Sequence, residues 1–189
     1  MANVIFVPAG DVSADVVREL WSEVVGNTTE KLVHDLLALV DPRVERLVVA
    51  PLPDAIGWEG VYLKLVGEPE RNPISSFGDG MKKATQLALA LVRARGGVLL
   101  IDELDDGLHY SALARLWRFL VVAARQLETQ VFATSHSKDC LESIAHLYRE
   151  DSSIADDISV HRLDKGETKS ADSEARAVAN LIEAEMEIR

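Results

Sequence analysis

The stretch Val98-Leu99-Leu100-Ile101-Asp102-Glu103 decides how this chain folds. Four consecutive apolar residues are typical of a strand buried on both faces of a parallel sheet. Two carboxylates follow directly, at the edge where open α/β sheets bind their ligands. One carboxylate there can hold Mg²⁺, and its neighbour can orient or deprotonate an attacking water. The alternative is that Asp102 and Glu103 only cap the next helix.

Two further motifs flank this strand. Upstream, Ser75-Ser76-Phe77-Gly78-Asp79-Gly80 precedes a helix with an apolar period over residues 81–95. Downstream, a second apolar run ends in Thr134-Ser135-His136-Ser137. Asp106-Gly107-Leu108-His109 lies between them. Because strands and helices alternate, the pattern predicts an α/β domain with a mainly parallel sheet flanked by helices.

This series of motifs resembles the second half of the nucleotide-binding domain of ABC-type ATPases. It is more closely similar to the OLD-like (overcoming-lysogenisation-defect) AAA-family bacterial ATPases. The resemblance is strong over residues 75–140 and weak elsewhere. It implies a partial P-loop NTPase fold of the ABC ATPase type, with ATP and Mg²⁺ as cofactors.

The resemblance gives a role to the residues at the ends of the two strands. Asp102 is the expected magnesium ligand of a Walker B motif, and Glu103 is the expected base or water-orienting group. His136 resembles the switch histidine that hydrogen-bonds the terminal phosphate, a task that suits an imidazole held by one nitrogen. Asp106–His109 resembles the D-loop at the interface between protomers.

The signature motif, residues 76–80, is expected to meet the terminal phosphate of an ATP bound by the opposite protomer. Ser76, Gly78 and Gly80 would bind it because exposed amides and the helix dipole favour an anion. The motif departs from the transporter pattern Leu-Ser-Gly-Gly-Gln, since Phe77 separates serine from glycine and Asp79 adds negative charge. The alternative is an ordinary helix cap.

Lys82 and Lys83 lie one turn into the helix that the signature motif opens. They either offset phosphate charge or lie on a solvated face. The residues alone leave both alternatives open.

None of the eleven glycines is followed by lysine, so the sequence lacks Gly-x-x-x-x-Gly-Lys, whose amides and lysine hold phosphates. We therefore interpret residues 1–189 as a single domain, the carboxyl-terminal lobe of an ABC/OLD-like ATPase. This lobe would act in a dimeric ATP sandwich, either as a homodimer or in a hetero-assembly. A lobe or subunit that bears Walker A would complete the site, and the chain alone would be inactive. The alternative is a non-catalytic interaction module or partner subunit of a P-loop ATPase. A metal-dependent hydrolase is a third reading that no further ligand pattern supports.

Composition narrows the class of protein. The net charge of −11, from 31 acids and 20 bases, argues against a broad surface for nucleic acid or anionic membrane, so nucleic acid is expected only through partners. Cys140, the only cysteine, excludes an internal disulfide and is expected to be a small buried residue. No segment reaches the roughly 20 apolar residues of a membrane span, and no signal peptide is visible, so we expect a cytoplasmic protein without membrane contact.

The remaining patterns predict the other elements. The missing lobe is also expected to leave a sheet edge or an apolar face exposed. The predicted strands and helices are a strand over Val4–Val7, a helix from Asp11 or Ser13 to about Val25, a helix from Asn27 through Val40, a peripheral hairpin of Glu45–Ala50 with Val61–Val66, helices over Tyr110–Leu127 and Lys138–Tyr148, a hairpin of Ile158–Leu163 with Glu167–Lys169, and a closing helix over Glu174–Met186.

Overall fold

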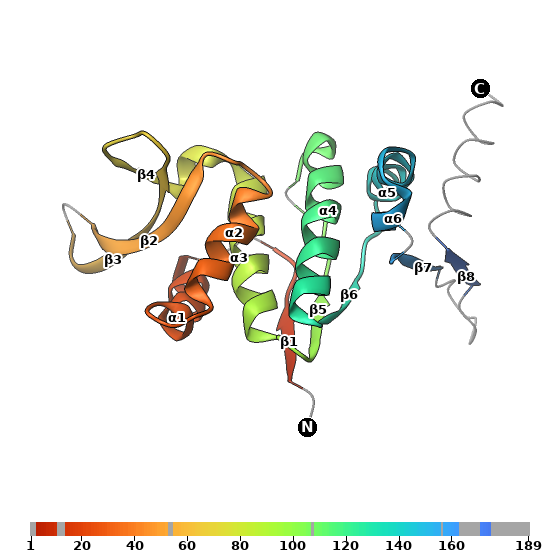
Figure 1. Cartoon of the computed structure of the whole chain (residues 1–189), viewed down its shortest axis with the longest axis horizontal. Helices are drawn as coiled ribbons and strands as arrows, with labels where there is room; N and C mark the ends of the chain where they lie inside the picture. Colours follow the sequence, from red (N-terminus) through yellow and green to blue (C-terminus); the bar gives the residue numbers. More distant parts are fainter. Residues whose placement is uncertain are drawn as a thin grey trace.

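A three-stranded parallel sheet forms the centre of the molecule, in the order β1-β5-β6 (Figure 1). Its strands are β1 (Val4–Val7), β5 (Val98–Ile101) and β6 (Gln130–Ala133). The α/β class predicted from the sequence is confirmed. The computed structural model describes residues 3–10, 14–52, 55–106, 108–155, 157–162 and 171–174.

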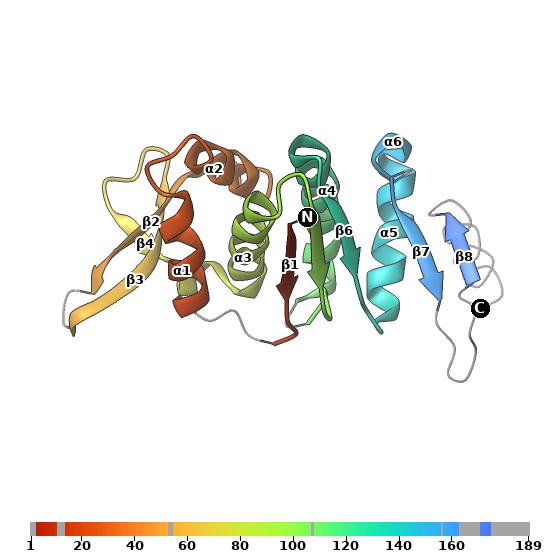
Figure 2. The same cartoon turned by 90° about the horizontal axis from the view of Figure 1, so that it is seen from below.

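The two faces of this sheet differ. Leu99 and Ile101 point into the core, with exposed fractions of 0% and 2%. On the other face Phe6, Leu100 and Phe132 pair across the three strands and form one row. Phe6 is 60% exposed and Phe132 53%. Among the described residues no helix covers this row (Figure 2), so the expected exposed apolar face is present.

Helix α3 (Asp79–Arg93) is the centre of the core. It contacts α1 (Ala14–Val24), α2 (Glu30–Ala38), α4 (Tyr110–Leu127) and β1. Because neighbours surround it, nearly every residue from Met81 to Val92 is buried. Helix α5 (Lys138–Glu150) packs on α4 and continues into the short α6 (Ser152–Ala155). The expected cap of α1 at Asp11 or Ser13 lies outside the described residues.

A second, antiparallel sheet stands at one end of the molecule (Figure 1). Strands β2 (Val44–Leu52) and β3 (Ala55–Leu65) form the predicted hairpin. The sequence did not predict the third strand, β4 (Arg71–Pro73), which pairs with β3. It runs directly into the 3₁₀ helix η1 (Ile74–Phe77), so this sheet positions the signature motif.

The carboxyl-terminal hairpin differs in its return strand from the hairpin that the sequence predicts. Strand β7 (Ser159–Arg162) pairs with β8 (Ala171–Glu174), while the predicted return strand Glu167–Lys169 lies outside the described residues. The sequence Ala-Asp-Ser-Glu has no apolar alternation, so backbone pairing alone makes it a strand. Glu174 ends β8 instead of starting a helix, and the rest of the predicted helix lies outside the described residues.

The expected burial of Cys140 is confirmed: it lies on the packed face of α5, where desolvation raises the pKa of its thiol. Trp21 is buried in the main core. Trp117 is partly buried between packed helices, while the side chain of Trp58 lies outside the described part. Among the helices described here, none is long and apolar enough to cross a bilayer.

Candidate functional site

The carboxyl ends of β5 and β6 are joined through Thr134. Its hydroxyl donates a hydrogen bond to Oδ1 of Asp102 at 2.7 Å and accepts one from the backbone N–H of Glu103 at 3.0 Å. The N–H of Asp102 donates to the carbonyl of Val7 at 2.9 Å, which ties the end of β1 to the same place. This role of Thr134 was not predicted from the sequence. The available signal was a hydroxyl residue at a strand end, two positions before His136.

Glu103 and His136 face each other across this edge. Nδ1 of His136 lies 3.7 Å from Oε1 of Glu103. The two side chains are 81% and 43% exposed respectively, so both can reach a ligand at the surface. The structure thus brings together the three residues predicted at the strand ends, Asp102, Glu103 and His136. Their chemical roles stay predictions.

The backbone of Glu103 is in the left-handed region, with φ of 46°. A residue with a Cβ in this region is strained by about 1–2 kcal/mol and is held there by its surroundings. Such outliers gather at active sites, so this one supports a functional reading of the turn.

The signature motif spans the junction of η1 and α3. Ser76 lies in η1, and its hydroxyl donates to the carbonyl of Pro73 at 2.7 Å. Gly78 precedes α3 with φ of 76°, where glycine is favoured, and no side chain caps the helix. Gly80 lies in the first turn, where an added Cβ would meet only Cβ of Ala112 at 3.7 Å. The sterics therefore require glycine at Gly78 and allow alanine at Gly80.

Lys83 is a buried residue within electrostatic range of the acidic turn, which we define as residues 102–106. Its side chain is 3% exposed, and its Nζ makes no hydrogen bond with the described residues. Desolvation lowers its pKa below the usual 10.5, while the carboxylates of the acidic turn oppose this shift. Lys82, by contrast, pairs with Asp79 at 2.8 Å. Lys83 is therefore not on a solvated face, and the carboxylates that act on its charge belong to its own chain.

The predicted D-loop region is only partly described. Oδ2 of Asp106 accepts a hydrogen bond from the N–H of Gly10 at 3.0 Å. This contact joins the loop after β1 to the acidic turn. His109 caps α4 by accepting from the N–H of Ser111, while Gly107 lies outside the described residues.

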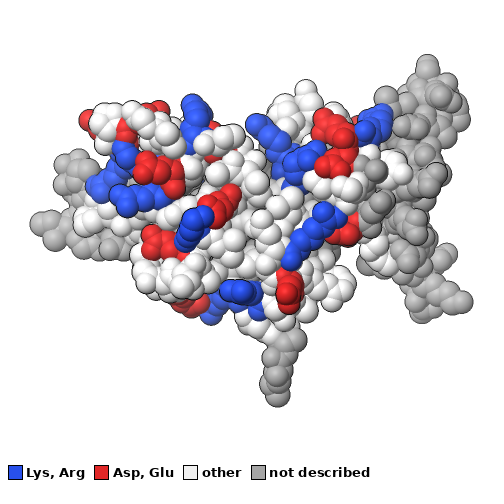
Figure 3. All heavy atoms as spheres, viewed as in Figure 1, with Lys and Arg blue, Asp and Glu red and all other residues white. Residues whose placement is uncertain are grey.

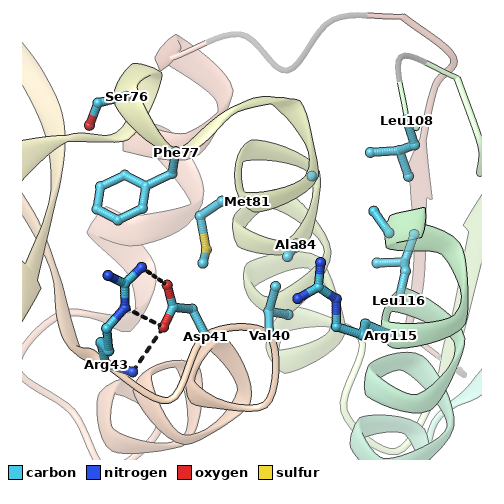
Figure 4. Close-up of a pocket in the computed structure, with 12 residues that line it drawn as sticks. Val40, Asp41, Arg43, Ser76, Phe77, Met81, Ala84, Leu108, Arg115 and Leu116 are labelled. Atoms are coloured by element: carbon cyan, nitrogen blue, oxygen red, sulfur yellow. Dashed lines mark hydrogen bonds and ion pairs between the residues drawn. The ribbon is translucent and has the colours of Figure 1, made fainter. Parts of the chain in front are cut away.

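A cavity of about 400 Å³ lies beside the signature motif (Figure 4). Phe77 and Met81 form part of its apolar wall, and Asp41 and Arg43 form an ion pair of 2.7 Å at its rim. The hydrogen bond from Arg43 holds the pKa of Asp41 below its usual value. The side chain of Arg115, from α4, approaches the cavity from the opposite side.

The acidic turn fits a magnesium ion only if a ligand supplies further oxygens. Asp102 gives one carboxylate, already oriented by the Thr134 hydroxyl. Among the described residues no group of three or more acidic, histidine or cysteine side chains could hold a metal. Mg²⁺ is commonly bound by one or two carboxylates together with water and substrate phosphates. The donor set therefore fits a magnesium–nucleotide complex better than a bare ion.

Charges on the molecular surface are mixed. On the face shown in Figure 3, described lysine and arginine side chains are interspersed with acidic ones.

The sequence of residues 28–139 matches the family described as "AAA domain, putative AbiEii toxin, Type IV TA system". The range includes all the candidate site residues. A Helicobacter pylori (strain ATCC 700392 / 26695) protein named "ATP/GTP phosphatase" is 32% identical over 91 residues, which are 47% of this chain and 25% of that protein. The match thus spans about a quarter of the curated relative.

Solved structures share the fold over most of the chain. One, described as "Structural biochemistry of ATP-driven dimerization and DNA stimulated activation of SMC ATPases", has a TM-score of 0.55 at 16% identity and covers 92% of this chain and 98% of its own. The SMC head domain from Thermotoga maritima has a TM-score of 0.50 at 15% identity and covers 91% of this chain and 53% of its own. The fold is therefore that of SMC ATPase heads.

Proposed function

Because the chain belongs to this AAA-domain family of ABC-type ATPases, we propose that it is the carboxyl-terminal lobe of an ATPase that acts in a dimeric ATP sandwich. The observation that carries the proposal is the linked set Asp102, Glu103, Thr134 and His136 at one sheet edge. An ATP-hydrolysing site needs positioned charge at such an edge more than it needs covalent chemistry.

Each residue of the set has a distinct task in the proposal. Asp102 holds Mg²⁺, which neutralises phosphate charge when it is bound with ATP. Glu103 orients the attacking water and accepts its proton. His136 donates a hydrogen bond to the terminal phosphate, and its position 3.7 Å from Glu103 places both groups around one small volume. A partner's ATP meets Ser76, Gly78 and Gly80, whose exposed helix start favours an anion.

The groups that bind the other phosphates of ATP must belong to another lobe or subunit, because the 189 residues contain no Gly-Lys pair. We propose that a P-loop-bearing lobe covers the row Phe6, Leu100 and Phe132, which we name the bare face. Parallel sheets are normally covered on both faces. A helix that runs antiparallel to these strands on the bare face would start at the edge that carries Asp102. Helix starts of this kind bind phosphate.

Copurification tests this arrangement. The chain is expressed together with a candidate partner from the same genome, a polypeptide that carries Gly-x-x-x-x-Gly-Lys. We call this partner the P-loop-bearing polypeptide. We expect a complex that the double variant Phe6→Glu/Phe132→Glu weakens at least about tenfold, because two charges would be buried against apolar surface. The matched control is Val66→Glu, since Val66 is 65% exposed but lies in the turn directly after β3, away from the bare face. Equal loss in both variants, or no loss, would contradict the proposed docking face.

The non-catalytic interaction module is the second candidate. The similarity of the fold to SMC ATPase heads supports an interaction module as much as it supports an ATPase. It predicts a stable complex without ATP turnover, so the turnover measurement below separates the two.

A further inference from the structure

The acidic turn depends on one hydroxyl for two of its hydrogen bonds. Oγ1 of Thr134 has a single hydrogen, which it donates to Asp102, and it accepts the N–H of Glu103. The hydroxyl therefore fixes a side chain and a neighbouring backbone unit together. Its branched Cβ limits χ1, so the hydroxyl is held in place before any ligand binds.

The backbone of Thr134 contributes two more links. Its N–H donates to the carbonyl of Ile101 at 2.9 Å, and its carbonyl accepts the N–H of Leu104 at 2.9 Å. Residues 101–104, on both sides of Glu103, are thus hydrogen-bonded to the single residue that directly follows β6. Among the three backbone groups of residues 101–104 that bond to Thr134, only the N–H of Glu103 bonds to its side chain, and Glu103 is the residue with φ of 46°.

We propose that Thr134 is the positioning residue of this site: its hydroxyl orients the Asp102 carboxylate and holds Glu103 in its left-handed conformation, so that Glu103 faces His136. The inference rests on the proposed function, because it assigns Thr134 to the same reaction. Thr134 acts through Asp102 and Glu103.

The rival explanation is that the two backbone links alone hold the turn. Thr134→Val separates the explanations because valine keeps the shape and the backbone but lacks the hydroxyl. Thr134→Ser keeps the hydroxyl and serves as the rescue variant. The turn is near the surface, so water can solvate Asp102 in the valine variant, and the fold is expected to persist.

The first measurement is amide hydrogen exchange, followed by NMR on the chain itself without nucleotide. In Thr134→Val we expect the Glu103 amide to exchange about tenfold faster, the effect of one lost hydrogen bond. Exchange at Leu104, whose acceptor is the Thr134 carbonyl, is expected to stay within about threefold, and Thr134→Ser is expected to match the wild type. Equal Glu103 exchange in the threonine, serine and valine proteins would overturn the inference.

The second measurement is ATP turnover in the assembly with the P-loop-bearing polypeptide. Thr134→Val is expected to lower kcat about 10- to 100-fold with KM for ATP little changed, and Thr134→Ser to restore it. Normal turnover in the valine variant would overturn the positioning role. Absence of turnover in every protein, wild type included, would instead contradict the proposed function. The exchange result would then decide the structural role of the hydroxyl on its own.

Discussion

His136 and Glu103 follow two neighbouring parallel strands, and Nδ1 of the first lies 3.7 Å from Oε1 of the second. The two residues are 33 positions apart in the sequence numbering and meet only because β5 and β6 pair in parallel register, with Ile101 beside Ala133. This pairing brings a candidate base and a candidate phosphate ligand to one edge.

Replacing Glu103 by glutamine tests the candidate base. In the assembly with the P-loop-bearing polypeptide, Glu103→Gln is expected to abolish turnover, by about 100-fold or more, and to keep ATP binding. The amide preserves shape but removes the basic oxygen. Steady-state turnover and equilibrium ATP binding, measured side by side, check this. A variant that retains most of its turnover would remove Glu103 from the proposed role.

Charge at the start of α3 tests the signature motif. Gly78→Asp and Ser76→Arg are expected to block ATP-driven dimerisation while ATP still binds the P-loop lobe, because an acid repels the phosphate and a bulky side chain obstructs it. Solution scattering with Glu103→Gln as background measures the mass of the assembly. Since φ at Gly78 is 76°, Gly78→Ala is the control for backbone strain without charge. A stable ATP-bound dimer of Gly78→Asp would show that the motif is only a helix cap.

Two glycines with different surroundings give a stability test. An added Cβ at Gly97 would lie 2.1 Å from the carbonyl oxygen of Asn3, which accepts the N–H of Val98. Gly97→Ala is therefore expected to lower the free energy of unfolding by more than about 2 kcal/mol. Gly80→Ala, in a helix with room for Cβ, is expected to raise it by about 0.5–1 kcal/mol. Urea unfolding of both variants checks the pair, and equal effects would contradict the packing described at Gly97.

His34 predicts a loss of stability in acid. Desolvation lowers the pKa of His34 from 6.5, and its ring packs against Trp21 with centroids 5.8 Å apart. As pH falls below 6.5, the His34 imidazole binds a proton in the unfolded chain but stays neutral in the folded chain. The free energy of unfolding therefore decreases. In His34→Phe this contribution is absent. Urea unfolding from about pH 7.5 to about pH 5.5 should therefore show a smaller decrease in the variant, and identical decreases would contradict a desolvated His34.

Local sequence patterns were sufficient for elements that bury an apolar face. The stripe over Tyr110–Leu127 predicted α4 with its observed bounds, and the run Val98–Ile101 predicted β5. Strand β8 was not predicted because its four residues have no apolar alternation and depend on pairing with β7. Strand β4 was missed for a similar reason, since it is three residues long and contains a proline.

The sequence predicted that Asp102, Glu103 and His136 follow neighbouring strands, but it did not predict how these residues are connected. Apolar runs ending in Asp102-Glu103 and in His136 identified the edge. The link through Thr134 depends on the register between strands, which one sequence does not specify. The burial of Lys83 could not be predicted either, because Lys82 is its neighbour in sequence. Only the packing of α3 shows which of the two lysines is buried.

Calorimetry of MgATP binding, with turnover measured on the same samples, tests the central claim most directly. The chain alone is predicted to show neither micromolar binding nor hydrolysis, because it lacks the amide cradle and lysine that hold phosphates. Together with the P-loop-bearing polypeptide it is predicted to show both. Micromolar binding by the isolated chain, or a stable complex that binds ATP and never hydrolyses it, would contradict the assignment as an ATPase lobe.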